Sequence, residues 1–140
     1  MFNLDLSTDF GQRVARRLRE ERIIWLITVD SHGVPQPNPI WFWWDGETIL
    51  MYSLPDTAKL RNIAAHPQVT LHFDGDGRGG DIIVITGEAR VDPTAPSAAQ
   101  HTEYAAKYQW GFESIHKTAE EFARTYSVPV HIIPRKVRGH

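Results

Sequence analysis

The stretch that decides the fold covers residues 23–53 and reads IIWLITVDSHGVPQPNPIWFWWDGETILMYS. Its first seven residues favour an extended conformation, and residues 30–33 (DSHG) supply a tight turn. Residues 45 and 46 (DG) form a second turn before the extended run at 48–53. Two turns between three β-favouring segments predict a meander of three antiparallel strands, in which the second strand pairs with the third.

The rest of the chain adds strands to this meander and helices around it. Ser7 or Thr8 can cap a helix that ends near residue 21, with Phe10, Val14 and Leu18 as its apolar stripe and its arginines, Arg17 among them, largely outside that stripe. A short helix is expected at 57–65, strands at 68–73 and 82–91, a helical region at 93–126 broken near 108–111, and a last strand at 128–133. This order predicts a mainly β protein with flanking helices, built as a barrel or strongly twisted sheet.

Two patterns in the second strand are unusual. Pro35, Pro37 and Pro39 fall on alternate residues, so they share one face and remove three backbone donors from one side of the strand. The aromatic run at residues 41–44 (WFWW) follows, and alternation sends its first and third side chains to one side and its second and fourth to the other. Such a run belongs in a core, an interface or a ring-binding groove.

Whole-chain properties exclude several classes of function. A length of 140 residues fits one domain, spanning 1–140, and a net charge of −2 gives no field that would attract nucleic acid or an anionic membrane. The chain has no cysteine, and its seven histidines lack the spacing of a metal site, so we expect no metal. An acidic N-terminus and the lack of an apolar run of about 20 residues predict a cytoplasmic protein with no membrane span.

The segment at residues 53–62 (SLPDTAKLRN) carries the clearest binding chemistry. Here a strand ends and a helix begins, so backbone N–H groups at the helix start lie near several polar side chains. These side chains are Ser53, Thr57, Lys59, Arg61 and Asn62. They predict a phosphate-binding corner, and the alternative from local chemistry alone is a solvated basic face with an ordinary threonine cap.

These segments together resemble a known family. The first helix, the DSHG hairpin, the segment at 39–42 (PIWF), the DG turn, and the sequence at 59–62 (KLRN) with Pro67 five residues beyond it are similar to the pyridoxamine 5′-phosphate oxidase-like split β-barrel superfamily. Within it the chain most resembles the short flavin/deazaflavin oxidoreductases that use the deazaflavin coenzyme F420. The resemblance implies a split β-barrel of six or seven antiparallel strands and a homodimer with sites at the subunit interface.

The resemblance also implies which residues bind the cofactor. In such proteins the Lys-x-Arg-Asn corner holds the cofactor phosphate, which assigns that role to Lys59, Arg61 and Asn62, supported by Thr57 and Ser53. The strand at Asn38, Pro39, Ile40 and Trp41 would line the ring, with Tyr52 on the neighbouring strand. The late aromatic group, formed by Tyr108, Gln109, Trp110 and Phe112, would contribute to the site of the other subunit.

The function that follows is an F420-dependent reductase that transfers hydride to a conjugated organic substrate. The cofactor carries this chemistry, so no side chain is expected to act as a nucleophile, and Tyr52, His72 or solvent would supply a proton. One alternative is an FMN-binding flavoprotein of the same fold. Another is a non-enzymatic module that binds a cofactor, a tetrapyrrole or a fatty acid.

Overall fold

The computed structural model describes residues 2–140, which form one seven-stranded antiparallel sheet and four helices. The helices are α1 (Asp9–Glu20), α2 (Ala58–Ala65), α3 (Thr102–Ser114) and α4 (Ala119–Thr125). The strands are β1 (Ile24–Val29), β2 (Pro35–Ile40), β3 (Trp43–Trp44), β4 (Ile49–Ser53), β5 (Gln68–His72), β6 (Ile83–Val91) and β7 (Val128–Gly139). Across the sheet the order is β2-β1-β5-β6-β7-β4-β3. None of the described helices has the length and apolar character that a membrane span needs.

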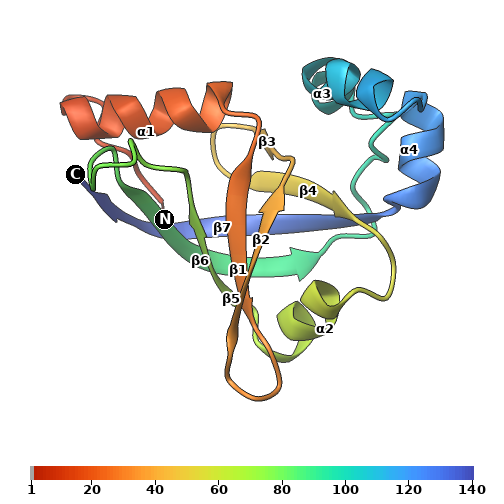
Figure 1. The fold of residues 1–140 in the computed structure, drawn as a ribbon, viewed down its shortest axis with the longest axis horizontal. Coiled ribbons are helices and arrows are strands. Elements are labelled where there is room, and N and C mark those ends of the chain that lie inside the picture. Colours follow the sequence, from red (N-terminus) through yellow and green to blue (C-terminus); the bar gives the residue numbers. More distant parts are fainter. Residues whose placement is uncertain (1) are drawn as a thin grey trace.

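The sheet curls into a half-barrel, with β1 and β2 crossing in front of β7 and β4 in Figure 1. Leu26 of β1, Met51 of β4 and Ile132 of β7 therefore meet in one core although their strands lie apart in the sheet order. Helix α1 covers one end of this core with Val14 and Leu18, both fully buried. The predicted split β-barrel is thus confirmed, with seven strands.

The predicted meander of three strands is wrong in one respect. β1 and β2 form the expected hairpin, and the turn at residues 45 and 46 joins β3 to β4 as expected, but the predicted second strand is split into β2 and β3, so β4 pairs with β3 and β7 and not with β2. The three prolines give the physical reason. The residues that alternate with the prolines direct their N–H groups toward β1 and form the ladder with it. The edge of β2 that faces away from β1 would need N–H groups from the three prolines, which have none, so this edge is a poor partner for a further strand.

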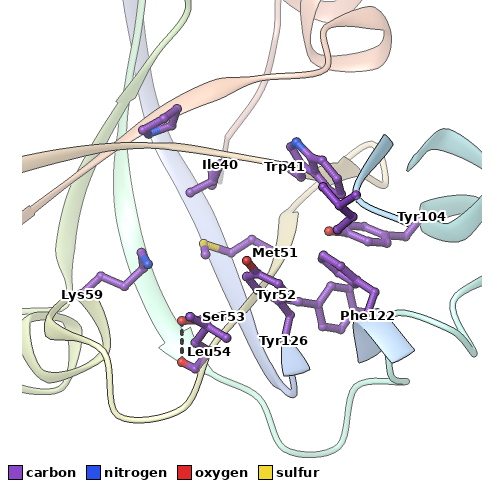
Figure 2. A pocket seen from close by; sticks show the side chains of 12 residues that line it. Ile40, Trp41, Met51, Tyr52, Ser53, Leu54, Lys59, Tyr104, Phe122 and Tyr126 are labelled. Carbon is purple, nitrogen blue, oxygen red and sulfur yellow. Dashed lines mark hydrogen bonds between the residues drawn. The ribbon is translucent and has the colours of Figure 1, made fainter. Parts of the chain in front are cut away.

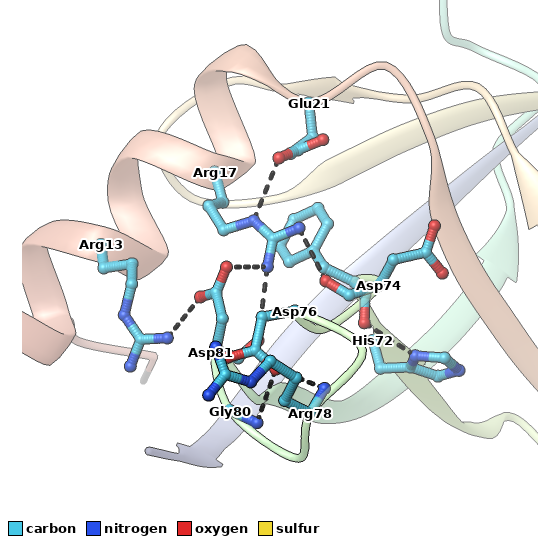
Figure 3. Close-up of polar contacts among 10 residues, drawn as sticks. Arg13, Arg17, Glu21, His72, Asp74, Asp76, Arg78, Gly80 and Asp81 are labelled. Carbon is cyan, nitrogen blue, oxygen red and sulfur yellow. Dashed lines mark hydrogen bonds and ion pairs between the residues drawn. The ribbon is translucent and has the colours of Figure 1, made fainter.

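Arg17 is buried, whereas the helical pattern predicted that it would lie outside the apolar stripe of α1. Its guanidinium donates to the backbone oxygen of Asp74 at 2.9 Å and pairs with Glu21 and Asp81 (Figure 3). It also lies 4.8 Å from the ring centroid of Phe73. A buried charge is tolerated when it is paired and hydrogen-bonded, and here these bonds tie the loop before β6 to α1.

The aromatic run divides between two cores as the alternation predicts. Phe42 is fully buried in the barrel core and Trp44 packs against it, while Trp41 and Trp43 pack against a second cluster built by α3 and α4. The run therefore joins the barrel to the helical lobe formed by α3 and α4.

The helical region breaks later than predicted. Helix α3 continues through residues 108–111, and the break lies between Ser114 and Ala119. Gly111, which lies within the predicted break, has a packing role, because a β-carbon there would overlap the Trp41 ring.

The last strand is longer than predicted. β7 continues past Pro134 to Gly139, and the ladder with β6 shifts register between Thr86 and Gly87 at this point. A proline is accommodated at such a bulge because the ladder is locally interrupted there.

Candidate functional site

A cavity of about 360 Å³ lies where the barrel meets the helical lobe (Figure 2). The end of β2, all of β4 beyond Leu50, the start of α2 and the lobe each contribute to its wall. Its lining residues are Pro39, Ile40, Trp41, Met51, Tyr52, Ser53, Leu54, Lys59, Tyr104, Ile115, Phe122 and Tyr126. The volume falls within the range of small-molecule and cofactor sites.

Lys59 is the charged residue of this wall. Its side chain reaches the cavity from α2, and it is half-buried. It makes no hydrogen bond or ion pair with any residue in the described range 2–140, and desolvation lowers its pKa. An ammonium that is partly desolvated and has no carboxylate partner is suited to bind an anion.

Ser53 lines the same end of the cavity, and Thr57, which does not line it, lies next to Ser53. Ser53 is 2% exposed, and its Oγ lies 3.2 Å from the Oγ1 of Thr57. Thr57 is the N-cap residue of α2, yet its side chain does not cap the helix. The first backbone N–H groups of α2 are thus without this capping acceptor, which leaves them able to bind an anion beside Lys59.

Arg61 and Asn62 do not line this cavity, although the family pattern places both at the phosphate. Arg61 is exposed and donates from Nη1 to the backbone oxygen of Asp56 at 2.8 Å. Asp56 has a φ of 59°, so this bond supports a turn in the left-handed region. Asn62 is buried, and its amide donates to Thr28 Oγ1 at 3.0 Å, which fastens α2 to β1.

The residues expected to line a ring are partly gathered here. Pro39, Ile40, Trp41 and Tyr52 all belong to the cavity wall, whereas Asn38 does not. The Tyr52 hydroxyl donates to the backbone oxygen of Pro96 at 2.7 Å, and burial raises its pKa to about 12. This bond and this pKa make Tyr52 a poor proton donor. His72 lies outside the cavity, stacked on Trp25.

The late aromatic group behaves differently from what the resemblance implies. Tyr108 and Phe112 are fully buried in the aromatic cluster of their own chain, so neither can reach a second subunit. Tyr108 instead receives a hydrogen bond from the Phe42 backbone N–H at 2.8 Å. Trp110 is 38% exposed and carries Arg22 over its ring at 4.2 Å, but it does not line the cavity.

Four aromatic or apolar residues of the lobe were not predicted as site residues: Tyr104, Ile115, Phe122 and Tyr126. Phe122 stacks on Tyr126 at a centroid distance of 4.4 Å and packs against Trp41 at 5.5 Å. The cavity therefore has a polar end at Lys59 and an aromatic end at the lobe. Among residues 2–140 no three His, Asp or Glu side chains are grouped so as to hold a metal ion.

Comparison with protein families identifies the chain. The family model for pyridoxamine 5′-phosphate oxidase matches residues 10–136. The chain belongs to this family. The match covers the whole sheet except the end of β7, and it includes every residue that lines the cavity. A search of curated protein sequences found no match.

Solved structures share the fold of this pyridoxamine 5′-phosphate oxidase family member at low sequence identity. An F420 reductase is 23% identical, with a TM-score of 0.68 over 88% of this chain and 94% of that one. An FAD-binding protein from Mesorhizobium loti is 19% identical, with a TM-score of 0.64 over 88% of each chain. The haem storage protein HutZ from Vibrio cholerae is 12% identical, with a TM-score of 0.63 over 99% of this chain and 95% of that one. Relatives of this fold thus bind different cofactors.

Proposed function

We propose that this protein is an oxidoreductase that binds a deazaflavin of the F420 type, with a flavin such as FMN as the alternative cofactor. The observation that carries the proposal is Lys59, a half-buried ammonium with no anionic partner in residues 2–140, at the polar end of an aromatic cavity. Both cofactors combine a phosphate with a flat ring: the polar end of the cavity matches the phosphate, and the wall at Pro39, Ile40 and Trp41 matches the ring.

In this proposal the side chains bind and orient. Lys59 and the start of α2 hold the phosphate with support from Thr57, while the Ser53 hydroxyl donates to the Leu54 backbone oxygen at 2.8 Å and can only accept a further hydrogen bond. Pro39, Ile40 and Trp41 lie along the ring, and the lobe residues exclude water from the remaining space. When bound, the cofactor supplies the hydride chemistry, and the chain contributes orientation and charge compensation.

The second candidate is a binding module without turnover, which the haem storage relative suggests. No histidine lines the cavity of this chain, and the Tyr52 hydroxyl is bonded to Pro96. Histidine, the proximal ligand of globins and peroxidases, is therefore absent from the cavity wall, while Met51, Tyr104 and Tyr126 remain as residues of ligand type. The absence of a histidine from the wall favours a flavin-type ring over haem.

The test is a titration of the protein with F420 and, separately, with FMN, followed by cofactor fluorescence. Lys59→Ala should weaken binding by about 1.5 to 3 kcal/mol, since it removes a charge-assisted contact. Lys136→Ala is the matched control, because Lys136 is an exposed lysine on β7 outside this cavity.

Comparing F420 with FMN distinguishes a deazaflavin-dependent protein from a flavoprotein. Binding of F420 that is lost in Lys59→Ala supports the deazaflavin proposal, and binding of FMN alone supports a flavoprotein. Equal affinity of Lys59→Ala and wild type would show that the anion site is elsewhere. Arg61→Ala belongs in the same series, because its bond to Asp56 predicts a smaller effect than that of Lys59.

A further inference from the structure

Tyr104 of α3 has a free hydroxyl in an otherwise closed environment. The residue is 1% exposed, and its hydroxyl makes no hydrogen bond with any residue in the range 2–140. Every fully buried side-chain N or O atom of the described residues has a partner. The Tyr104 hydroxyl is therefore not completely enclosed, and Tyr104 lines the cavity, into which its side chain points in Figure 2.

The position of Tyr104 places this hydroxyl at the aromatic end. Figure 2 shows Tyr104 reaching in from α3 near Trp41, on the opposite side of the cavity from Lys59. Its ring is held by Tyr52 at a centroid distance of 4.7 Å and by Tyr108 at 4.9 Å. These contacts fix the ring, so the hydroxyl is presented in one direction.

The hydroxyl keeps its proton under ordinary conditions. Burial raises the pKa of Tyr104, and the neighbouring tyrosines Tyr108 and Tyr52 raise it further. A neutral phenol is a good hydrogen-bond donor to an uncharged oxygen. Tyr52 and Tyr126 also line the cavity, and the Tyr52 hydroxyl already donates to the Pro96 backbone oxygen.

We propose that Tyr104 donates a hydrogen bond to the carbonyl oxygen of a flat, uncharged, conjugated ketone that occupies the aromatic end of the cavity. The walls formed by Trp41, Phe122 and Tyr126 provide faces and edges for a planar ring, and no charged side chain lines this end. A buried donor that is left without a partner costs free energy, so a ligand with an acceptor at this point is preferred over one without.

This inference rests on the proposed function, in which a substrate and a cofactor share the cavity. Its test, however, needs no cofactor. Two probes of matched shape differ only in the acceptor: 2-acetylnaphthalene has a carbonyl and 2-ethylnaphthalene has none. Binding of each to the protein without cofactor is measured by calorimetry. Tyr104→Phe removes the hydroxyl and keeps the ring, and thermal unfolding checks that the variant is folded.

We expect wild type to prefer the ketone, and Tyr104→Phe to lose about three- to tenfold in affinity for it while its affinity for 2-ethylnaphthalene stays unchanged. Tyr52→Phe removes a hydroxyl that is bonded to Pro96, so the ratio of the two affinities should not change. Equal loss for both probes in Tyr104→Phe, or no binding of either probe to wild type, would overturn the proposal.

A titration of Tyr104→Phe with FMN and F420 separates this inference from the proposed function. Unchanged cofactor affinity with a lost ketone preference supports a substrate role for the hydroxyl. Weaker cofactor binding with an unchanged ketone preference would place the hydrogen bond on the cofactor and overturn the inference. Failure of both cofactors to bind wild type would overturn the proposed function alone, because the probes carry no phosphate.

Discussion

At the residue scale, the Lys59 ammonium decides how cofactor affinity depends on pH. Desolvation lowers its pKa, so it loses its charge at a lower pH than an exposed lysine, whose pKa is about 10.4. A bound phosphate favours the charged form. Affinity for F420 or FMN should therefore fall as the pH rises through the pKa of Lys59, and titrations between pH 7 and 10 should show this fall.

The variant Lys59→Arg is the control for this pH effect. A guanidinium stays charged over the whole interval, so any affinity that the variant keeps should be constant from pH 7 to 10. If cofactor affinity fell equally with pH in Lys59→Arg and in wild type, a group other than Lys59 would be responsible for the pH dependence.

Lys107 of α3 gives a second prediction at this scale, for stability. Burial lowers its pKa to about 8, partly offset by Glu21, while the unfolded value is about 10.4. Between these values the unfolded chain binds more protons, so the free energy of unfolding should rise with pH from about 8 to 10.4. In Lys107→Met an apolar side chain of similar length replaces the ammonium that lies 3.9 Å from the Phe42 ring centroid, so denaturant unfolding of this variant should lack this part of the rise. A pH profile equal to that of wild type would contradict this assignment.

At the scale of elements, α3 is joined to the aromatic run through Gly111. In an exposed helix, replacing glycine by alanine stabilises by about 1 kcal/mol. At Gly111 the added methyl group would overlap the Trp41 ring, so we expect Gly111→Ala to destabilise by about 1 to 3 kcal/mol. Thermal and denaturant unfolding of Gly111→Ala and wild type will show whether the substitution lowers or raises the free energy of unfolding.

Ala106 provides the matched control in the same helix. It is exposed, so Ala106→Gly should cost about 1 kcal/mol from helix propensity alone. Stabilisation by Gly111→Ala would mean that the lobe does not pack on Trp41 as described.

Local signals predicted most elements but not all of their pairings. Thr8 caps α1 as expected, and α2 ends at Ala65, with His66 as its C-cap just before Pro67. The turn at residues 45 and 46 was also correct, yet it pairs β4 with the two-residue strand β3 rather than with β2. Hairpin signals specify neighbours in sequence, whereas the pairing of β4 with β7 depends on how the whole sheet closes.

As with the strands, only the part of the candidate site that is local in sequence could be predicted. Lys59, Ser53 and Thr57 lie at a strand-to-helix junction, and that junction is visible in the sequence. Asn62 shares the same motif, but its contact with Thr28 joins residues 34 positions apart and has no local signal. Tyr104 was missed because a tyrosine in a helical segment is most often part of a core. Its place in the cavity wall depends on how α3 packs against the barrel, which no local pattern in the sequence indicates.

At the scale of the whole molecule, the outer face of the sheet bears on the proposed homodimer. On β1 the inward residues are buried, while Trp25, Ile27 and Val29 on the outward face are only half-buried. They lie opposite Pro39, Pro37 and Pro35 of β2 in the ladder. Together these six residues form an apolar outer face at the β2 edge, and such a face is typical of an interface with another protein surface.

We expect the protein to be a dimer in solution and Ile27→Glu to convert it to a monomer. The substitution places a charge at the centre of the apolar outer face, next to Pro37 and Thr70, where burial against a partner would desolvate it. Sedimentation velocity measures the change. Gln100→Glu adds the same charge at an exposed site just before α3 and should leave the dimer intact.

Cofactor binding tests whether the dimer matters to the site. If each cavity is completed by the second subunit, Ile27→Glu should weaken F420 or FMN binding in parallel with dissociation, although Ile27 does not line the cavity. Affinity should then depend on protein concentration in wild type, because dilution dissociates the dimer. A monomeric wild type with tight cofactor binding would show instead that one chain suffices, and that the apolar outer face serves another partner.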